Sequence, residues 1–232
     1  MLSLYWLQHS EKILKMIVSF SGIDSAGKTT QIEKLTEYLD AHQVKYIKKW
    51  SKARGTPGVE FLKSLVRKET PESDEEKVAA RKEIYKSSKK QRLLYAASLL
   101  DLCWYWGVYY RWLNLTHKYL ICDRYLWDTY VEMKHDFYSI DIDHSFLWKM
   151  VRFCTPKPKV SFVFIIPAEL SLARDLQKGT DGTEDIERKK SKIDVYMSLV
   201  EQKKWTNVMD GTKTRETLHQ EVLDIIGIGN GN

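Results

Sequence analysis

Residues 22–29 carry the strongest chemical signal in this chain of 232 residues. They match the pattern G-x-x-x-x-G-K-[ST], with Lys28 and Thr29 at its end. Because glycine has no Cβ, Gly22 and Gly27 let the backbone turn sharply and approach an anion closely. The N–H groups of such a loop point inward, and the positive end of the following helix adds to the attraction. The pattern therefore predicts a phosphate-binding P-loop.

The segments on either side of the loop support this interpretation. Residues 16–20 are short, apolar and β-prone, and residues 31–39 place Ile32, Leu35 and Leu39 on one helical face. An ordinary glycine turn before a helix is the alternative, and the order strand, loop, helix argues against it. We expect Lys28 to reach the outer phosphates and the Thr29 hydroxyl to ligate Mg²⁺. The predicted phosphate-binding set is Gly22, Ile23, Asp24, Ser25, Ala26, Gly27, Lys28, Thr29 and Thr30.

Composition sets only broad limits on the function. The net charge is +6, from 37 basic and 31 acidic residues. This mild excess suits a protein that handles anionic phosphates, and it does not indicate a nucleic-acid partner. The three cysteines are far apart, with no C-x-x-C pair. They indicate buried thiols in a reducing compartment, so we expect a cytoplasmic protein.

Two apolar stretches need separate interpretations. Residues 1–15 lack a proper secretory core and cleavage site, so they are treated as an N-terminal extension. Residues 93–113 are mostly apolar, but Asp101 and Arg111 make a membrane span costly. A buried helix is the better prediction, and no membrane partner is expected.

From residue 16 to residue 232 we expect one α/β domain. Apolar β-prone segments near 17–20, 44–47, 118–122, 160–166 and 206–209 alternate with helical periodicity. This alternation predicts a parallel sheet with helices on both faces. Ligands of such sheets bind at the carboxyl ends of the strands. The P-loop, residues 50–57, residues 123–125 and Pro167 all follow strand ends.

A long helix is predicted from about residue 78 to residue 115, with Gly107 as an interruption. Its first half is basic and its second half is aromatic. Such aromatic surface is more often core or interface than a platform for nucleic-acid bases. The tryptophan-rich stretch 104–112 therefore favours a homodimer.

Several segments together resemble thymidylate kinases, within the nucleoside-monophosphate kinase group of P-loop proteins. The resemblance covers most of residues 16–226 and is strongest at 20–31, 93–97 and 121–125. It implies a three-layer α/β P-loop NTPase fold, with a five-stranded parallel sheet, helices on both faces and a short lid at about 176–190. The weaker matches are Gly55–Pro57, Tyr196–Leu199 and Met209–Gly211.

The resemblance implies transfer of the γ-phosphoryl group of ATP, with Mg²⁺, to a nucleoside monophosphate, dTMP above all. Such transfer needs in-line positioning and neutralised charge more than covalent help from the protein. Arg124 would bind the acceptor phosphate as a planar, bidentate donor, and Asp123 would support Mg²⁺ through water. A surface salt bridge is the alternative for this pair. The family match also assigns Asp24 to the acceptor sugar, Tyr95 to stacking on the base, and Tyr125 to the acceptor side.

The family inserts an arginine at the phosphates, either from the P-loop or from the lid. Ser25 stands at the P-loop position here, so the lid must supply the charge. Arg174 is the first candidate, followed by Lys178 and Arg188. A solvated, charged helix beside a flexible loop would explain the same residues.

Three departures from the family pattern fall on the acceptor side. Leu99 replaces the arginine that reads the base, and Ser51 replaces another, with Lys52 and Arg54 as substitutes. Ser21 replaces a glutamate. Three hypotheses therefore stay open: a thymidylate kinase or close relative, a kinase of this fold for another acceptor such as a nucleoside or sugar, and a nucleotide-binding module without turnover.

Overall fold

The computed structural model describes residues 16–50, 88–179 and 184–228. The chain divides into two compact units. Of the described residues, the first unit holds 16–50, 112–127, 157–179 and 184–228, and the second holds 88–111 and 128–156. The expectation of a single domain over residues 16–232 stays a prediction.

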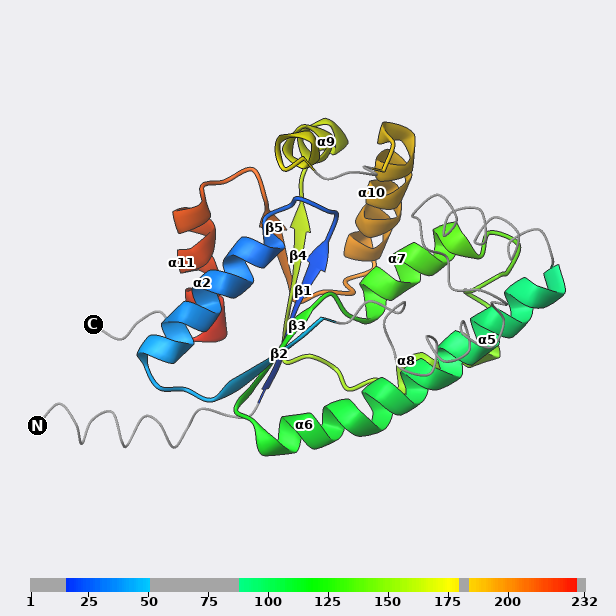
Figure 1. Ribbon diagram of the computed structural model, residues 1–232, viewed down its shortest axis with the longest axis horizontal. Helices are drawn as coiled ribbons and strands as arrows, with labels where there is room; N and C mark the ends of the chain where they lie inside the picture. The colour runs from blue at the N-terminus through cyan, green and yellow to red at the C-terminus, as the bar shows by residue number, and fades with distance from the viewer. Residues whose placement is uncertain (1–15, 51–87, 180–183, 229–232) are drawn as a thin grey trace, which may run out of the picture. The chain divides into compact units, whose positions relative to one another are not determined.

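A parallel sheet of five strands forms the centre of the first unit (Figure 1). The strand order is β2-β3-β1-β4-β5, and every neighbouring pair is parallel. All seven residues of β1 are buried, as expected for a central strand covered on both faces. The predicted α/β class with a five-stranded parallel sheet is thus confirmed. The strands are β1 (Met16–Gly22), β2 (Tyr46–Trp50), β3 (Tyr119–Asp123), β4 (Val160–Ile165) and β5 (Asn207–Asp210).

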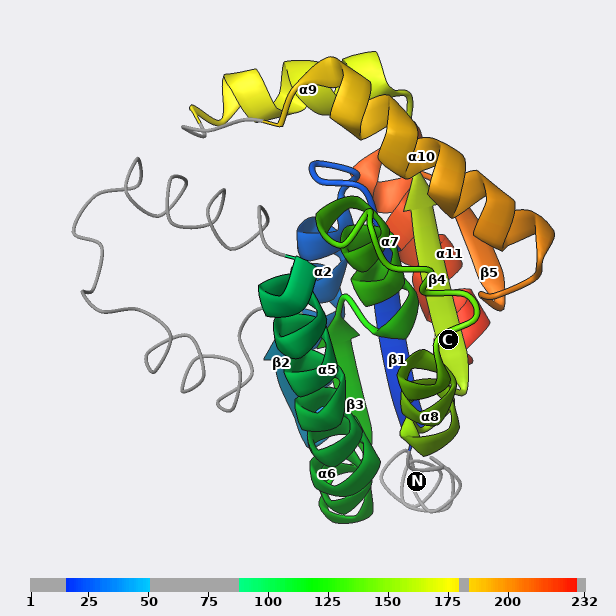
Figure 2. The same cartoon turned by 90° about the vertical axis from the view of Figure 1, so that its right-hand side faces the viewer.

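Helices lie on both sides of this sheet. Helices α2 (Lys28–Ala41) and α11 (Arg215–Ile226) share one side, and α10 (Ile186–Glu201) lies on the other, as Figures 1 and 2 show. Helix α9 (Ala168–Gln177) lies beyond the carboxyl end of β4. Apolar side chains from α2, α11 and the strands form one buried core, which includes Val18, Phe20, Ile32, Leu35, Phe162, Phe164 and Val222.

The second unit is helical. It consists of α5 (Ser88–Trp104), a π-helical stretch (Tyr105–Tyr110), most of α7 (Leu126–Asp136), and α8 (Phe146–Cys154). A Cβ at Gly107 would lie 3.2 Å from the Cβ of Cys154, so glycine lets α8 approach the π-helical stretch. Trp104 is 60% exposed, whereas Trp106 is fully buried. Helix α6 (Arg111–Thr116) continues the chain toward β3.

Helix α10 ends at Glu201, and Lys203 just beyond it adopts a left-handed conformation with φ of 54°. The backbone N–H groups of Lys203 and Lys204 then bond to the carbonyls of Val200 and Leu199. The part of the expected 78–115 helix before residue 88 lies outside the described residues. Within the described ranges, no helix has both the length and the apolarity to cross a membrane.

Strand register aligns the carboxyl ends of the sheet. Phe20 of β1 is opposite Asp123 of β3, and Gly22 of β1 is opposite Phe164 of β4. Ile165 is in turn opposite Asp210, the last residue of β5. The loops after β1, β3, β4 and β5 therefore begin along one edge, as predicted for a ligand site. Residues 51–57, expected at the same edge, lie outside the described residues.

Candidate active site

The loop between β1 and α2 has the backbone geometry of a phosphate site. Gly22 has φ of 130°, and a Cβ there would lie 2.3 Å from the carbonyl oxygen of Phe164. Gly27 has φ of 95° and precedes α2, which has no side-chain cap. Both positions require glycine, for close approach and for a left-handed conformation. The uncapped start of α2 directs backbone N–H groups and a positive helix end toward an anion.

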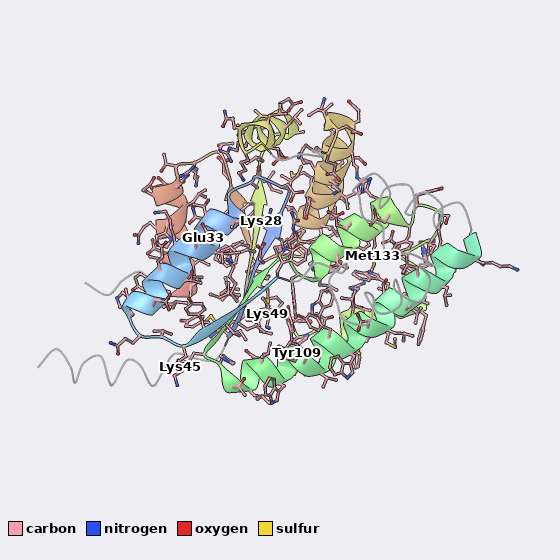
Figure 3. The ribbon with its side chains drawn as sticks, viewed as in Figure 1. Lys28, Glu33, Lys45, Lys49, Tyr109 and Met133 are labelled. Carbon is pink, nitrogen blue, oxygen red and sulfur yellow. The ribbon has the colours of Figure 1, made fainter. Side chains whose placement is uncertain are left out.

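Lys28 lies across this loop at the start of α2 (Figure 3). Its side chain is buried, and its Nζ donates to the carbonyl oxygens of Gly22 at 2.8 Å and Ile23 at 2.5 Å. These bonds hold a positive charge against the loop that follows β1. The ammonium group thus lies at the loop where the sequence predicts that it meets phosphate oxygens.

Asp24 and Arg124 form an ion pair beside the loop. Arg124 is buried, and its guanidinium also donates to the Gly22 carbonyl at 3.0 Å. Its backbone N–H bonds to the Phe20 carbonyl at 2.8 Å, with φ of 69°. A left-handed conformation is unfavourable for a residue with a side chain, and it clusters at functional sites. The residue after β3 is thus fixed to β1 by its backbone and to the P-loop by its side chain.

Two cations, Arg174 of α9 and Lys178 directly after that helix, reach Ser25, the residue that replaces the P-loop arginine. The Arg174 guanidinium donates to the carbonyls of Ser25 and Gly211, each at 3.2 Å. The Lys178 ammonium donates to the Ser25 hydroxyl at 3.0 Å. Arg188 differs, because its Nε lies 2.7 Å from Glu184 within the same segment. The structure thus brings Arg174 and Lys178 to the loop and pairs Arg188 with a neighbouring carboxylate.

Thr29 and Asp123, the predicted Mg²⁺ residues, come from neighbouring parts of the same edge. Thr29 is the second residue of α2 and is exposed, and Asp123 ends β3 opposite Phe20. Among the described residues, no group of three or more His, Cys, Asp or Glu side chains could hold a metal. Mg²⁺ is typically bound by one or two protein oxygens together with phosphates and waters. A hydroxyl and a carboxylate beside a phosphate loop therefore fit this ion.

The predicted base-binding residues lie in the second unit. The Tyr95 ring packs edge-on against Phe137, with ring centroids 5.4 Å apart, and burial raises the pKa of its hydroxyl. Leu99, one turn further along α5, is fully buried. Tyr125 is also buried, in the first unit. Lys52 and Arg54 lie outside the described residues. The roles of these side chains toward an acceptor stay predictions.

The sequence interpretation missed a buried polar group near the loop. Ser171 and Asp175 of α9 and Lys189 of α10 are all buried. Lys189 sits in the basic run 188–190, which resembles a solvated surface. A helical count would have revealed it, because Lys189 shares its spacing with Ile193 and Tyr196 on the face that packs inward.

Comparisons with known proteins identify relatives of this sequence. A family model described as Thymidylate kinase matches residues 20–222. The chain is 24% identical to a probable thymidylate kinase of Methanocaldococcus jannaschii, over 90% of this chain and 94% of that protein. It is 23% identical to a thymidylate kinase of Fervidobacterium nodosum, over 90% and 98% of the two chains. A thymidylate kinase of a Sulfurihydrogenibium species is 27% identical, over 89% and 94%. Since the family model spans most of the sequence, the chain belongs to the thymidylate kinase family.

Proposed function

We propose that this protein transfers the γ-phosphoryl group of ATP to dTMP, giving ADP and dTDP. The observation that carries the proposal is the convergence of Lys28, Arg124 and Arg174 on one glycine-rich loop at the carboxyl edge of the sheet. Lys28 and Arg124 both donate to the Gly22 carbonyl, and Arg174 donates to the Ser25 carbonyl. Family membership supplies the reaction class, and the names of the relatives supply dTMP as the acceptor.

The donor half of the reaction rests on the P-loop. Its N–H groups and Lys28 bind the ATP phosphates, and Thr29 and Asp123 hold Mg²⁺, the latter through water. Mg²⁺, when bound, neutralises charge on the phosphate oxygens. Arg174 and Lys178 add positive charge beside Ser25, where the family pattern has its P-loop arginine. Preorganised charge of this kind stabilises the transition state of phosphoryl transfer.

The acceptor half rests on Arg124, whose planar guanidinium suits an acceptor phosphate. Asp24 pairs with this group and so orients it, in addition to its proposed contact with the acceptor sugar. Tyr95 is the proposed partner of the base. A homodimer and a cytoplasmic location are further predictions.

A kinase of this fold with another acceptor is the second candidate, favoured by Leu99. This side chain is apolar and fully buried, whereas the family reads the base with an arginine there. A site that hydrogen-bonds a base rejects analogues strongly, so losing the donor relaxes the choice.

The deciding experiment measures ADP release from ATP and Mg²⁺ with a panel of acceptors. The panel contains dTMP, the other nucleoside monophosphates and the deoxynucleosides. We expect turnover to be fastest with dTMP and to disappear in Lys28→Ala. Faster turnover with another acceptor would support the second candidate. Binding of ATP without turnover on any member of the panel would contradict dTMP as the acceptor and leave an acceptor outside the panel, such as a sugar, or a nucleotide-binding module.

A further inference from the structure

A buried ion pair lies behind the P-loop. The side chain of Lys189 in α10 is 0% exposed, and its Nζ lies 2.6 Å from Oδ2 of Asp175 in α9. An ammonium group without contact with water needs a charged partner and further hydrogen bonds. This pair therefore links α10 to α9 at a fixed position.

Two hydrogen-bond paths run from this ammonium group to the loop. On the first path, the other oxygen of Asp175 accepts a hydrogen bond from the hydroxyl of Ser25. On the second, the Ser171 hydroxyl accepts from Lys189 at 3.1 Å and donates to the carbonyl of Asp24 at 2.8 Å. The paths end on consecutive residues of the P-loop.

The conformation of the peptide between these two residues sets the direction of a backbone N–H that a phosphate can bind. Ser25 has φ of 57°, a left-handed conformation that is unfavourable for a residue with a Cβ. Because the peptide group is planar and trans, fixing the Asp24 carbonyl also fixes the direction of the Ser25 N–H. Inward-pointing N–H groups are what such a loop offers to phosphates.

We propose that Lys189, Asp175 and Ser171 are positioning residues that hold the Asp24–Ser25 peptide in its phosphate-binding conformation. They act through the loop and through α9, which carries Arg174 and is followed directly by Lys178. The inference rests on the proposed function only in that the P-loop binds ATP. It adds that affinity for ATP depends on the packing of α10 against α9.

The serine hydroxyls give the first test. We expect Ser171→Ala and Ser25→Ala each to raise the Kd of MgATP about three- to ten-fold, the loss typical of one hydrogen bond. The matched control is Ser161→Ala. That buried hydroxyl accepts a hydrogen bond from the Thr206 backbone N–H at 2.9 Å, near the opposite end of β4. The control is expected to lower Tm without changing the Kd.

Replacing the ion pair separates positioning from stability. Lys189→Met alone leaves Asp175 buried without its ammonium partner, so Tm should fall. The double variant Asp175→Leu with Lys189→Met removes both charges and should regain most of the Tm, as apolar replacements of buried pairs often do. It should still bind MgATP about ten-fold more weakly, because Ser25 has lost its acceptor on Asp175, and Ser171, which donates to the Asp24 carbonyl, has lost Lys189.

The proposal is overturned if the folded double variant keeps the wild-type Kd for MgATP. If that variant does not fold, unchanged affinity in both serine variants overturns it. Binding of MgATP needs no acceptor, so this test stands even if dTMP is not phosphorylated. Conversely, normal affinity together with dTMP turnover in every variant would refute the positioning role and leave the proposed function intact.

Discussion

The carboxylate of Asp24 in the P-loop pairs with the guanidinium of Arg124, the residue that follows β3. The same guanidinium donates to the Gly22 carbonyl, so Arg124 is oriented from two sides. Such an arrangement presents a planar cation at the edge of the sheet without the entropy cost of an unrestrained side chain.

Replacing Arg124 with lysine keeps the charge but removes the planar fork. We expect Arg124→Lys to raise the acceptor KM and lower kcat, each by about ten-fold, because a bidentate charged bond is lost in the ground and transition states. Steady-state kinetics with dTMP measures both effects. Arg215→Lys on the exposed start of α11 is the control. An unchanged acceptor KM would remove Arg124 from the acceptor site.

The cations in and beside the predicted lid should differ in their contribution to kcat. Arg174 and Lys178 bond to Ser25, whereas Arg188 pairs with Glu184. We expect Arg174→Ala to lower kcat by about 10²- to 10³-fold, with Lys178→Ala next, since each removes charge beside the phosphate loop. Arg188→Ala should change kcat less than about three-fold, because it loses only a partly exposed ion pair.

Single-turnover rates at saturating ATP test this order. They isolate chemistry from product release. A loss in Arg188→Ala as large as that in Arg174→Ala would contradict the assignment. It would mean that Arg188 leaves Glu184 and reaches the phosphates during turnover.

Gly22 should be intolerant of any side chain. A Cβ there would lie 2.3 Å from the Phe164 carbonyl oxygen, and φ of 130° is unfavourable for other residues. We expect Gly22→Ala to lower the free energy of unfolding by about 2–5 kcal/mol, from steric overlap and backbone strain together. Gly227→Ala is the control, because φ is 81° there but nothing lies within 4 Å of the added Cβ. Denaturant titration should show a loss of only about 1 kcal/mol in that control. Equal losses in the two variants would contradict the contact with Phe164.

The sequence was most informative where backbone chemistry fixes the spacing. The P-loop could be predicted because Gly22, Gly27 and Lys28 perform their roles within one continuous segment. The parallel sheet could be predicted from the alternation of apolar strands with helical periodicity. The Asp24–Arg124 pair could not, since its members are 100 positions apart and meet only through strand order.

Lys189 shows a second reason why part of the site could not be predicted from the sequence. A lysine within a basic run is usually solvated. The sequence pattern does not predict that this lysine contacts Asp175 and Ser171. Helical spacing places Lys189 on the inward face of α10, but a single sequence does not specify that α9 packs there and supplies its partners. Leu99 is a milder case: its difference from the family pattern was visible, but its burial in the second unit was not.

His219 in α11 makes the stability of the fold depend on pH. Burial lowers the pKa of this imidazole, and the nearby Lys34 lowers it further, whereas Glu37 raises it. In the described residues, its Nδ1 is buried without a hydrogen-bond partner. The folded state therefore binds a proton less readily than the unfolded chain, whose histidine has a pKa of about 6.5. The stabilisation that the neutral imidazole contributes is complete above the unfolded-state pKa of about 6.5. It is lost as the pH falls from that value through the lower pKa of the folded state.

The variant His219→Gln should therefore lose less stability on acidification than the wild type. The measurement is the change in Tm between about pH 7.5 and about pH 5.5, a range that spans the titration of an unperturbed histidine. Other titrating groups shift both proteins equally, so the difference between the two slopes isolates His219. Parallel Tm curves over this range would show that the imidazole has the same proton affinity in the folded and unfolded states. A steeper fall in His219→Gln would reverse the sign, because it would mean that the folded protein stabilises the imidazolium form.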